Sequence, residues 1–452
     1  MNKLAFSLFA FLSISTLQAE PISLSQAIDK ALNSDPRISE LDNYVKKAEA
    51  LKKEATASNG LQIMANTFLG TSPALDGGFF TTEDCGSGEP CQLRVDRYKL
   101  NDGISPWWYL EFGLIKPLNT FGKIENFTIA AEKNIKLKQQ DVRIQRGKTI
   151  YDVKRAYYGY LAARDTRLFL NDVAKRIDGA AETVQFSLDE EDGNSTKSDM
   201  YALQSAQGLA KSYIKKAAAL EQVAIDGLKV LIQVPLDTKL ELADRGLQPV
   251  EMPSLALDEL TQKAMADRPE ISQLKDGLAA QKALIRAKKS MKKPNLYAGI
   301  VASVSYSPLR DRVDNPHIYD PFNDVGSTPV IGLKWEWEGG VQDARVLQAR
   351  AELGAITEKN RFAQLGIPYQ VSESFTQVNA HYESVEALKF SAKAARRWMI
   401  SLYTDFEAGL EPVDKLVNAF QAYVLSYSEY LQTVYAYNMQ VAQLEQIIGD
   451  YE

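Results

Sequence analysis

The feature that most constrains the fold of this chain is an internal duplication. The pattern that begins Leu24-x-x-Ala27 and contains Pro36 recurs as Leu257-x-x-Leu260 with Pro269, about half the chain further on. Later landmarks also recur, with Gly122 and Val153-x-x-Ala156-Tyr157 matched by Gly340 and Val371-x-x-Ser374-Phe375. A repeat of this kind buries its apolar faces against its neighbours, so the two copies need not be separate domains.

The duplication sets the expected boundaries. We predict a first structural repeat over residues 20–234, a proline-bearing connector over 235–256 and a second repeat over 257–452. The first copy carries an insertion between its opening pattern and Gly122. A Gly/Pro-rich acidic segment lies within that interval and is the natural candidate for the insertion.

Each copy repeats one order of elements. A helical segment, expected over 24–57 and again over 257–290, precedes a β-hairpin at about 61–116 and about 296–338. A long helical hairpin follows, over 123–234 in the first copy and 341–449 in the second. The sequence therefore predicts a mixed α+β fold that is mostly helical and has an internal twofold repeat.

The helices of these hairpins are too long for a compact domain. No proline occurs between Pro117 and Pro235, so Lys123 to Glu190 can form one helix about 100 Å long at about 1.5 Å per residue. In the second copy, Pro368 and Gly366 interrupt the matching stretch and predict a kink or a break.

The C-terminal segment indicates how such helices pack. Its apolar residues alternate steps of four and three, which is the seam of a coiled coil. A second stripe through Val424, Leu431 and Tyr435 widens the apolar face, so one broad stripe of a helical bundle remains an alternative. The seam comprises Leu416, Phe420, Tyr423, Tyr427, Tyr430, Val434, Tyr437, Val441, Leu444 and Ile448.

The N-terminus predicts export. Lys3 precedes the apolar stretch Leu4 to Leu17 and small Ala19, which is the pattern of a signal peptide over residues 1–19 and is short for a membrane-spanning anchor. In an exported protein, Cys85 and Cys91, close together in the acidic loop, are expected to form a local disulfide.

Composition excludes several functional classes. The net charge of -6, with no basic tract, argues against nucleic acid as a partner. Two histidines and two cysteines offer no metal-binding cluster, and no nucleophile and base signature or phosphate-binding loop is evident, so we expect neither a cofactor nor an enzyme.

The strands favour a membrane location. Strands of about ten residues can cross a bilayer when tilted, and Trp107, Trp108, Trp335 and Trp337 fall within the predicted hairpins, as interface tryptophans would. Any single one of these tryptophans could instead be an ordinary sheet aromatic.

Four strands cannot close into a barrel alone and open edges cannot face lipid, so several chains must share one barrel. Three copies would supply twelve strands.

In this arrangement of motifs the sequence resembles the outer membrane efflux protein (TolC) family of Gram-negative bacteria. The resemblance covers nearly the whole mature chain. It rests on both opening patterns, on Phe121-Gly122-Lys123 and Trp337-Glu-Gly-Gly340, and on Phe406-Glu-Ala-Gly409-Leu-Glu-Pro-Val-Asp414 followed by the heptads. It implies a homotrimer with a twelve-stranded transmembrane β-barrel in the outer membrane lipid and a coiled-coil α-barrel in the periplasm. It also implies docking to a periplasmic adaptor and an inner membrane pump or ABC transporter.

The resemblance further implies a gate at the turns of the two long hairpins. The first turn carries Asp189, Glu190, Glu191 and Asp192, which oppose the helix macrodipole and would form a cation-favouring field in a trimer. A merely solvated acidic turn is the alternative. Asp199 and Asp414 lie where family members carry acidic residues of the tip.

Two positions depart from the family pattern. Val417 stands where a second constriction carboxylate is found, and Glu411 lies near the position of a basic latch residue in some members. A carboxylate at position 411 cannot pair with Asp199, so the closing network should differ. The leading hypothesis is an exit duct for efflux or type I secretion, and the alternative is a periplasmic coiled-coil scaffold or adhesin.

Overall fold

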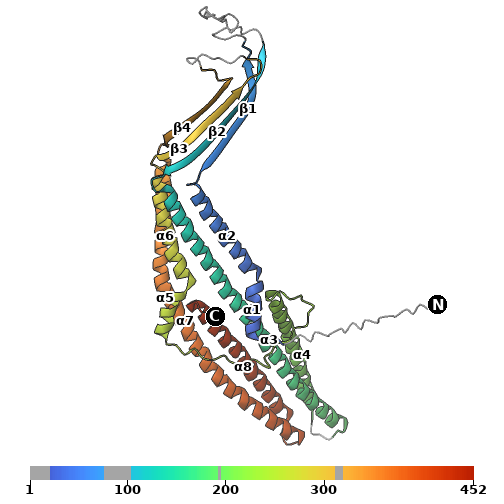
Figure 1. Cartoon of the computed structure of the whole chain (residues 1–452). Helices are drawn as coiled ribbons and strands as arrows, with labels where there is room; N and C mark the ends of the chain where they lie inside the picture. Colours follow the sequence, from blue (N-terminus) through green and yellow to red (C-terminus); the bar gives the residue numbers. More distant parts are fainter. Residues whose placement is uncertain (1–20, 76–102, 192–194, 311–318, 452) are drawn as a thin grey trace, which may run out of the picture. The chain divides into compact units, whose positions relative to one another are not determined.

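The computed structural model describes residues 21–75, 103–191, 195–310 and 319–451. Within them the order of elements occurs twice (Figure 1). The first copy contains α1 (Leu24–Ser34), α2 (Pro36–Ala57), β1 (Gln62–Pro73), β2 (Ile104–Asn119), α3 (Lys123–Asp189) and α4 (Lys197–Leu231). The second contains α5 (Leu257–Asp267), α6 (Pro269–Ser290), β3 (Asn295–Tyr306), β4 (Asp324–Lys334), α7 (Val341–Glu407) and α8 (Val413–Ile448).

The two copies match in detail. The helices α1 and α5 each have 11 residues, α2 and α6 each have 22, and α3 and α7 each have 67. The mostly helical α+β fold and its internal repeat are therefore confirmed.

Each repeat opens with two helices instead of the single helix expected from the sequence. Asp35 has ψ 115° and Arg268 has ψ 125°, so both residues leave the helical region immediately before a proline. The proline ring disfavours the α conformation in the residue that precedes it, yet suits the first position of the next helix. Pro36 and Pro269 therefore end one helix and begin another.

The four strands form one antiparallel sheet in the order β1-β2-β3-β4. The two copies meet at its centre, where β2 pairs with β3 from Trp108↔Tyr306 to Asn119↔Leu296. Strand β4 ends at Lys334 and not near Glu338 as expected, because its partner β3 begins at Asn295, opposite Lys334. Within this sheet, β1 and β4 each pair on one side only.

Glycine makes the passage from strand to helix in both copies. Gly122 has φ +83° and Gly340 has φ +95°, a region in which residues with a Cβ are disfavoured. The recurrence of these two glycines in the sequence thus reflects one turn used twice.

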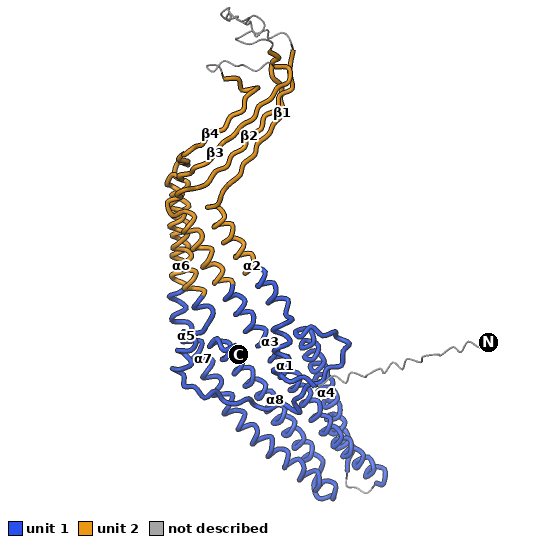
Figure 2. Tube along the Cα trace, viewed as in Figure 1, with its two compact units in different colours: residues 1–43, 139–272, 360–452 blue, residues 44–138, 273–359 orange. Residues whose placement is uncertain are grey.

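The chain divides into two compact units (Figure 2). One unit comprises Tyr44–Lys138 and Gln273–Lys359, and it contains the whole sheet. In it, Lys52 contacts Glu132, Lys133 contacts Asp276 at 3.0 Å, and Gln281 donates to the carbonyl of Ala349. The helices therefore lie in the order α2-α3-α6-α7, which is the order of the strands to which they connect.

The other unit contains Met1–Asn43, Gln139–Ser272 and Asn360–Glu452. Its helix α8 lies between α3 and α7, because Tyr423 packs edge-on against Phe169 and Phe420 packs against Tyr403. On the far side of α3, Arg167 bonds Glu221 of α4. The order here is α4-α3-α8-α7. Most of the heptad residues of α8 are buried, with Tyr437 and Val434 both 0% exposed.

Of the kink or break expected at Pro368, the break is not present. Helix α7 continues from Val341 to Glu407 with Pro368 inside it. The neighbouring side chains Ile367 and Val371 are both buried, at 5% and 0% exposure. Tertiary packing on both sides of the proline compensates for the helical hydrogen bond that its missing N–H cannot make.

Candidate functional site

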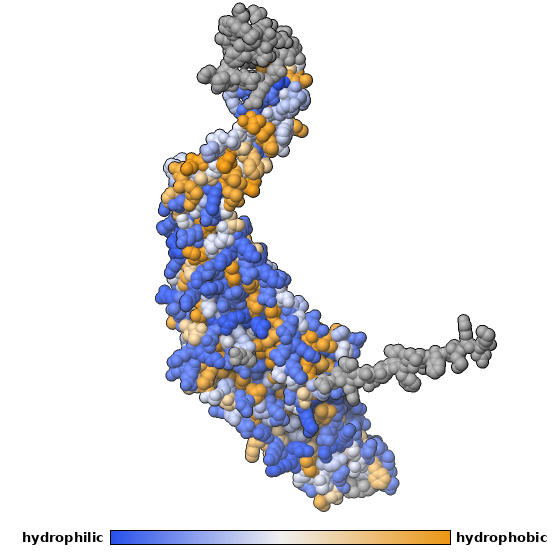
Figure 3. All heavy atoms as spheres, viewed as in Figure 1, coloured by the Kyte–Doolittle hydropathy of each residue, from blue (hydrophilic) through white to orange (hydrophobic). Residues whose placement is uncertain are grey.

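The sheet has one strongly apolar face, to which we refer as the apolar face. Side chains alternate between the faces of a strand, and the pairing register places the same kind of residue side by side on all four strands. Leu69 is 84% exposed there and Ile331 is 78% exposed. Figure 3 shows hydrophobic residues gathered over the strands. Members of this face include Ile63, Leu69, Trp108, Leu110, Phe112, Leu114, Ile300, Val304, Val325, Ile331 and Leu333.

The opposite side, the polar face, carries hydroxyl, amide and carboxylate groups together with several aromatic rings. In the register, Asn66 lies opposite Glu111, Ser72 opposite Ser105 and Val301 opposite Thr328. A sheet with one apolar and one polar face can separate two environments. Because the apolar face is exposed in this chain, it is available to contact lipid or another protein.

The four candidate interface tryptophans differ in position. Trp107 and Trp108 are adjacent in β2 and so point to opposite faces, which means that only Trp108 lies on the apolar face. Its Nε1 donates to Thr67 Oγ1 at 2.8 Å, whereas that of Trp107 donates to Ser305 Oγ at 2.8 Å.

The second pair lies just beyond the sheet. Trp335 and Trp337 follow the end of β4, with exposed fractions of 67% and 83%. Trp335 Nε1 donates to the carbonyl of Lys292 at 3.0 Å. Trp335 and Trp337 therefore lie at the helix-connected end of the sheet, whereas Trp107 and Trp108 lie toward its loop end.

The turn after α3 carries exposed acidic side chains. Asp189 accepts a hydrogen bond from Gln185 Nε2 at 2.8 Å, and the Glu190 amide donates to the carbonyl of Phe186. Glu191 has φ +52°, an uncommon conformation for a residue with a Cβ. Asp192 lies outside the described residues, as do Cys85, Cys91 and the expected signal peptide.

Asp199 has a structural partner that the sequence reasoning missed. Its carboxylate accepts from the Thr196 amide at 2.8 Å and from Thr196 Oγ1 at 2.7 Å, while the Asp199 amide donates to Thr196 Oγ1 at 3.3 Å. This reciprocal pair is a capping box at the start of α4. The spacing Thr-x-x-Asp was the signal that could have revealed it.

The turn between α7 and α8 also has an ion pair of its own. Gly409 has φ +70°, and Glu411 bonds Lys415 at 2.7 Å, four residues later. This hydrogen bond raises the pKa of Lys415. Asp414 is exposed in the first turn of α8, and Val417 packs against the apolar cluster of the neighbouring helices. The Glu-x-x-x-Lys spacing accounts for this pair, in which Glu411 is bonded by a basic residue four positions later in the chain.

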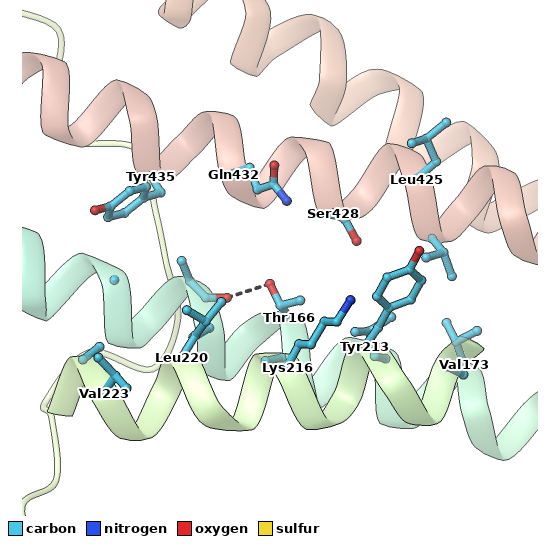
Figure 4. A pocket seen from close by; sticks show the side chains of 18 of the residues that line it. Thr166, Val173, Tyr213, Lys216, Leu220, Val223, Leu425, Ser428, Gln432 and Tyr435 are labelled. Atoms are coloured by element: carbon cyan, nitrogen blue, oxygen red, sulfur yellow. Dashed lines mark hydrogen bonds between the residues drawn. The ribbon is translucent and has the colours of Figure 1, made fainter. Parts of the chain in front are cut away.

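A groove of about 1240 Å³ lies along α3 between α4 and α8 (Figure 4). Small residues of α3, including Ala156, Gly159 and Ala163, form its floor. One wall is a heptad stripe on α4, formed by Leu209, Tyr213, Lys216, Leu220, Val223, Gly227 and Val230. The other wall is a stripe on α8, formed by Gln421, Leu425, Ser428, Gln432 and Tyr435.

The α4 stripe is exposed, with Leu220 at 63% and Val223 at 70%. Its alternating steps of four and three match those of α8 and could have been found in the sequence by the same count. An exposed heptad stripe facing a groove is suited to receive another helix.

Two further observations concern membrane and metal chemistry. Among the described residues, no cluster of histidine, cysteine or carboxylate side chains could hold a metal ion. In the same part of the chain, no helix combines the length and apolarity needed to span a membrane.

Comparison with known proteins gives matches at the level of structure. No protein-family model matches the chain, and no curated protein matches its sequence. The structure of CusC, described in connection with transmembrane channel formation, matches with a TM-score of 0.75 at 15% identity, over 94% of this chain and 91% of that one.

Two other solved structures are similar. CmeC, an outer membrane channel of Campylobacter jejuni, matches with a TM-score of 0.76 at 11% identity, covering 94% of this chain and 85% of that one. MtrE, an outer membrane channel of Neisseria gonorrhoeae in its open state, matches with a TM-score of 0.73 at 15% identity, covering 94% of this chain and 88% of that one. This chain therefore has the TolC-like fold seen in these outer membrane channels.

Proposed function

We propose that this protein is the subunit of a homotrimeric outer membrane channel that serves as the exit duct of an export system. The observation that carries the proposal is the two-faced sheet, which is exposed and apolar on one side and polar on the other. Such alternation is what a strand needs when it separates lipid from a water-filled lumen. The shared fold with solved outer membrane channels supports the same function.

Closure requires further copies of the chain. Strands β1 and β4 each leave one row of N–H and C=O groups without a partner in the sheet. Exposing each such unpaired group to hydrocarbon costs about 4 kcal/mol. Pairing β4 of one copy with β1 of the next removes both edges if the ring closes. Three copies give a barrel of twelve strands, an even number within the range of known transmembrane barrels.

The helical unit offers a second surface for the same assembly. It ends at α4 on one side and at α7 on the other, and both carry exposed apolar side chains. Phe362, Tyr369 and Phe390 of α7 are exposed by 76%, 65% and 77%. We assign the groove between α4 and α8 to a helix from a neighbouring copy, because a head-to-tail contact between unlike surfaces generates a ring.

The proposed duct is not an enzyme and needs no cofactor. It would lie in the outer membrane with its helical hairpins in the periplasm, and it would take cargo from a periplasmic adaptor and an inner membrane pump or ABC transporter. Small molecules of an efflux system and proteins of a type I secretion system are both possible cargo for such an architecture. The acidic hairpin turns, with Asp189, Glu190, Asp199 and Asp414, are the proposed entrance.

Two measurements on detergent-purified protein test the proposal. Electron microscopy should show a threefold ring, and planar bilayers to which the protein is added should show discrete ion-conducting steps. A monomer that remains in solution without detergent and gives no conductance would instead favour the periplasmic scaffold.

A further inference from the structure

Four aromatic rings gather on the polar face of the sheet toward its loop end. Phe68 stacks on Tyr109 with ring centroids 4.8 Å apart and an interplanar angle of 15°. Trp107 lies 5.8 Å from Tyr109 and 5.9 Å from Phe68. Phe322, just before β4, meets the Trp107 ring edge-on at 5.4 Å. The rings therefore form one continuous surface, which we call the aromatic patch.

The surrounding polar network holds this patch in place. Trp107 Nε1 donates to Ser305 Oγ, which in turn donates to the carbonyl of Pro321, next to Phe322. Arg310 bonds both carboxylate oxygens of Asp320, and both side chains are largely buried. Gly70 leaves room for the indole, since a Cβ there would lie 3.0 Å from the Trp107 ring. The aromatic patch is thus ordered before any ligand arrives.

The patch is electron-rich and lies beside a carboxylate. Tyr109 donates its hydroxyl hydrogen bond to Glu111 at 3.0 Å, and Glu111 is the diagonal neighbour of Phe68 across β1 and β2. The faces of aromatic rings attract cations. This attraction is already used at the edge of the patch, because the guanidinium of Arg310 lies 4.9 Å from the Phe322 ring centroid.

Phe68 is the open part of the patch. Its side chain is 49% exposed, whereas Trp107 and Tyr109 are only partly exposed. A ligand can therefore reach the Phe68 ring and the neighbouring Glu111 carboxylate from the polar side. A cation with an apolar or aromatic body would satisfy both, by stacking on Phe68 and by charge attraction to Glu111.

We propose that Phe68, Tyr109 and Glu111 form a binding site for organic cations on the pore-facing side of the sheet. This inference rests on the proposed channel function, because it takes the polar face as the wall of the lumen. It assigns to this part of the channel a preference for organic cations over organic anions of the same size and shape.

The test uses single-channel recording in planar bilayers with tetraphenylphosphonium as the probe and tetraphenylborate as the matched anion. For the unmodified protein, we expect tetraphenylphosphonium to block current at a concentration about tenfold below that of tetraphenylborate. Phe68→Leu and Glu111→Gln should each raise the half-blocking concentration of the cation about five- to tenfold.

Phe112→Leu is the matched control, because Phe112 lies on the apolar face of β2 and is similarly exposed, at 41%. It should leave the block by the cation unchanged. Equal block by the two ions, or block that Phe68→Leu and Glu111→Gln leave unaltered, would overturn the site while the conductance still supports a channel. An absence of conductance in the unmodified protein would contradict the channel function itself.

Discussion

At the scale of single residues, Asp35 anchors the junction between α1 and α2. Its carboxylate accepts from the amide, Nε and Nη2 of Arg37 and from Thr149 Oγ1 at 2.6 Å, and the residue is only 4% exposed. Burial acts to raise the pKa of Asp35, but the bonds from Arg37 and Thr149 outweigh it and lower the pKa below the ordinary value of 3.8.

We expect Asp35→Ala to destabilise the protein by about 1–3 kcal/mol, because it leaves Thr149 and part of Arg37 without their acceptor. Since the pKa of Asp35 is lowered by folding, this stabilisation is present above the ordinary pKa and is lost as the pH falls through the folded pKa. Thermal unfolding followed by circular dichroism should therefore show a lower melting temperature for Asp35→Ala than for the unmodified protein at neutral pH. This difference in melting temperature should disappear in acid.

The exposed Asp29→Ala in α1 serves as the control and should change stability by less than about 0.5 kcal/mol. If the melting temperature of Asp35→Ala stays equally far below that of the unmodified protein at low pH, the effect does not come from the Asp35 charge.

Asp199 allows a second test, because it combines a capping role with a candidate role in the entrance. Asp199→Asn keeps an oxygen that can accept from Thr196 and removes the charge, whereas Thr196→Ala keeps the charge and removes the cap hydroxyl. We expect Asp199→Asn to reduce the cation-over-anion permeability ratio about twofold. Thr196→Ala should instead weaken the start of α4 by about 1 kcal/mol.

Reversal potentials in a salt gradient measure the permeability ratio, and Asp414→Asn provides the equivalent change in the other hairpin turn. If neither carboxamide variant moves the reversal potential, Asp199 and Asp414 do not act on permeating ions, and the capping box alone explains Asp199.

These residues also show what the sequence can predict of the candidate site. Asp199 and Asp414 can be selected from the sequence because they follow recognisable turns, and the capping partner of Asp199 follows from the Thr-x-x-Asp spacing. The opposite orientations of Trp107 and Trp108 follow from alternation once both lie inside a strand. Which of the two lies on the apolar face depends on the residues that pair with them across the sheet.

At the scale of elements, α7 tests how far packing can override a local preference. Pro368 lacks the amide that would bond the carbonyl of Gln364, yet α7 runs through it. We predict that Pro368→Ala raises stability by up to about 3 kcal/mol and increases the melting temperature.

Gly366→Ala provides a graded comparison in the same turn. A Cβ at Gly366 would meet the Phe362 ring at 3.5 Å, which is an ordinary contact, so this variant should gain only about 1 kcal/mol. A melting temperature that falls in Pro368→Ala would instead mean that the native packing of α7 requires the proline.

Long-range pairing explains where the predicted elements and the observed ones differ. The seam of α8 was predictable because ten apolar residues repeat within one helix, and its buried side chains follow that pattern. The end of β4 was not predictable in the same way, because residues 335–338 alternate tryptophan and glutamate as a strand can, but lie beyond the residue that pairs with the start of β3. The sequence predicts one continuous helix across Pro36 and another across Pro269, because the apolar spacing continues through both prolines.

At the scale of the whole molecule, the two faces of the sheet should respond differently to one charge. Ile331 lies on the apolar face of β4 and Thr328 lies on the polar face of the same strand, and both are exposed. If the apolar face contacts lipid, Ile331→Asp places a carboxylate in hydrocarbon, at a cost of up to about 3 kcal/mol per chain that would be repeated in every copy of the ring.

We therefore expect Ile331→Asp to reduce the amount of assembled protein recovered from outer membranes, while Thr328→Asp, which faces the proposed lumen, should assemble normally and increase cation selectivity. Gel mobility of unheated samples measures assembly, and planar bilayer recording measures selectivity. Equal losses in the two variants would mean that β4 is sensitive to charge on either face. Normal assembly of Ile331→Asp would show that the apolar face does not contact lipid. The channel proposal would then lose the observation on which it most depends.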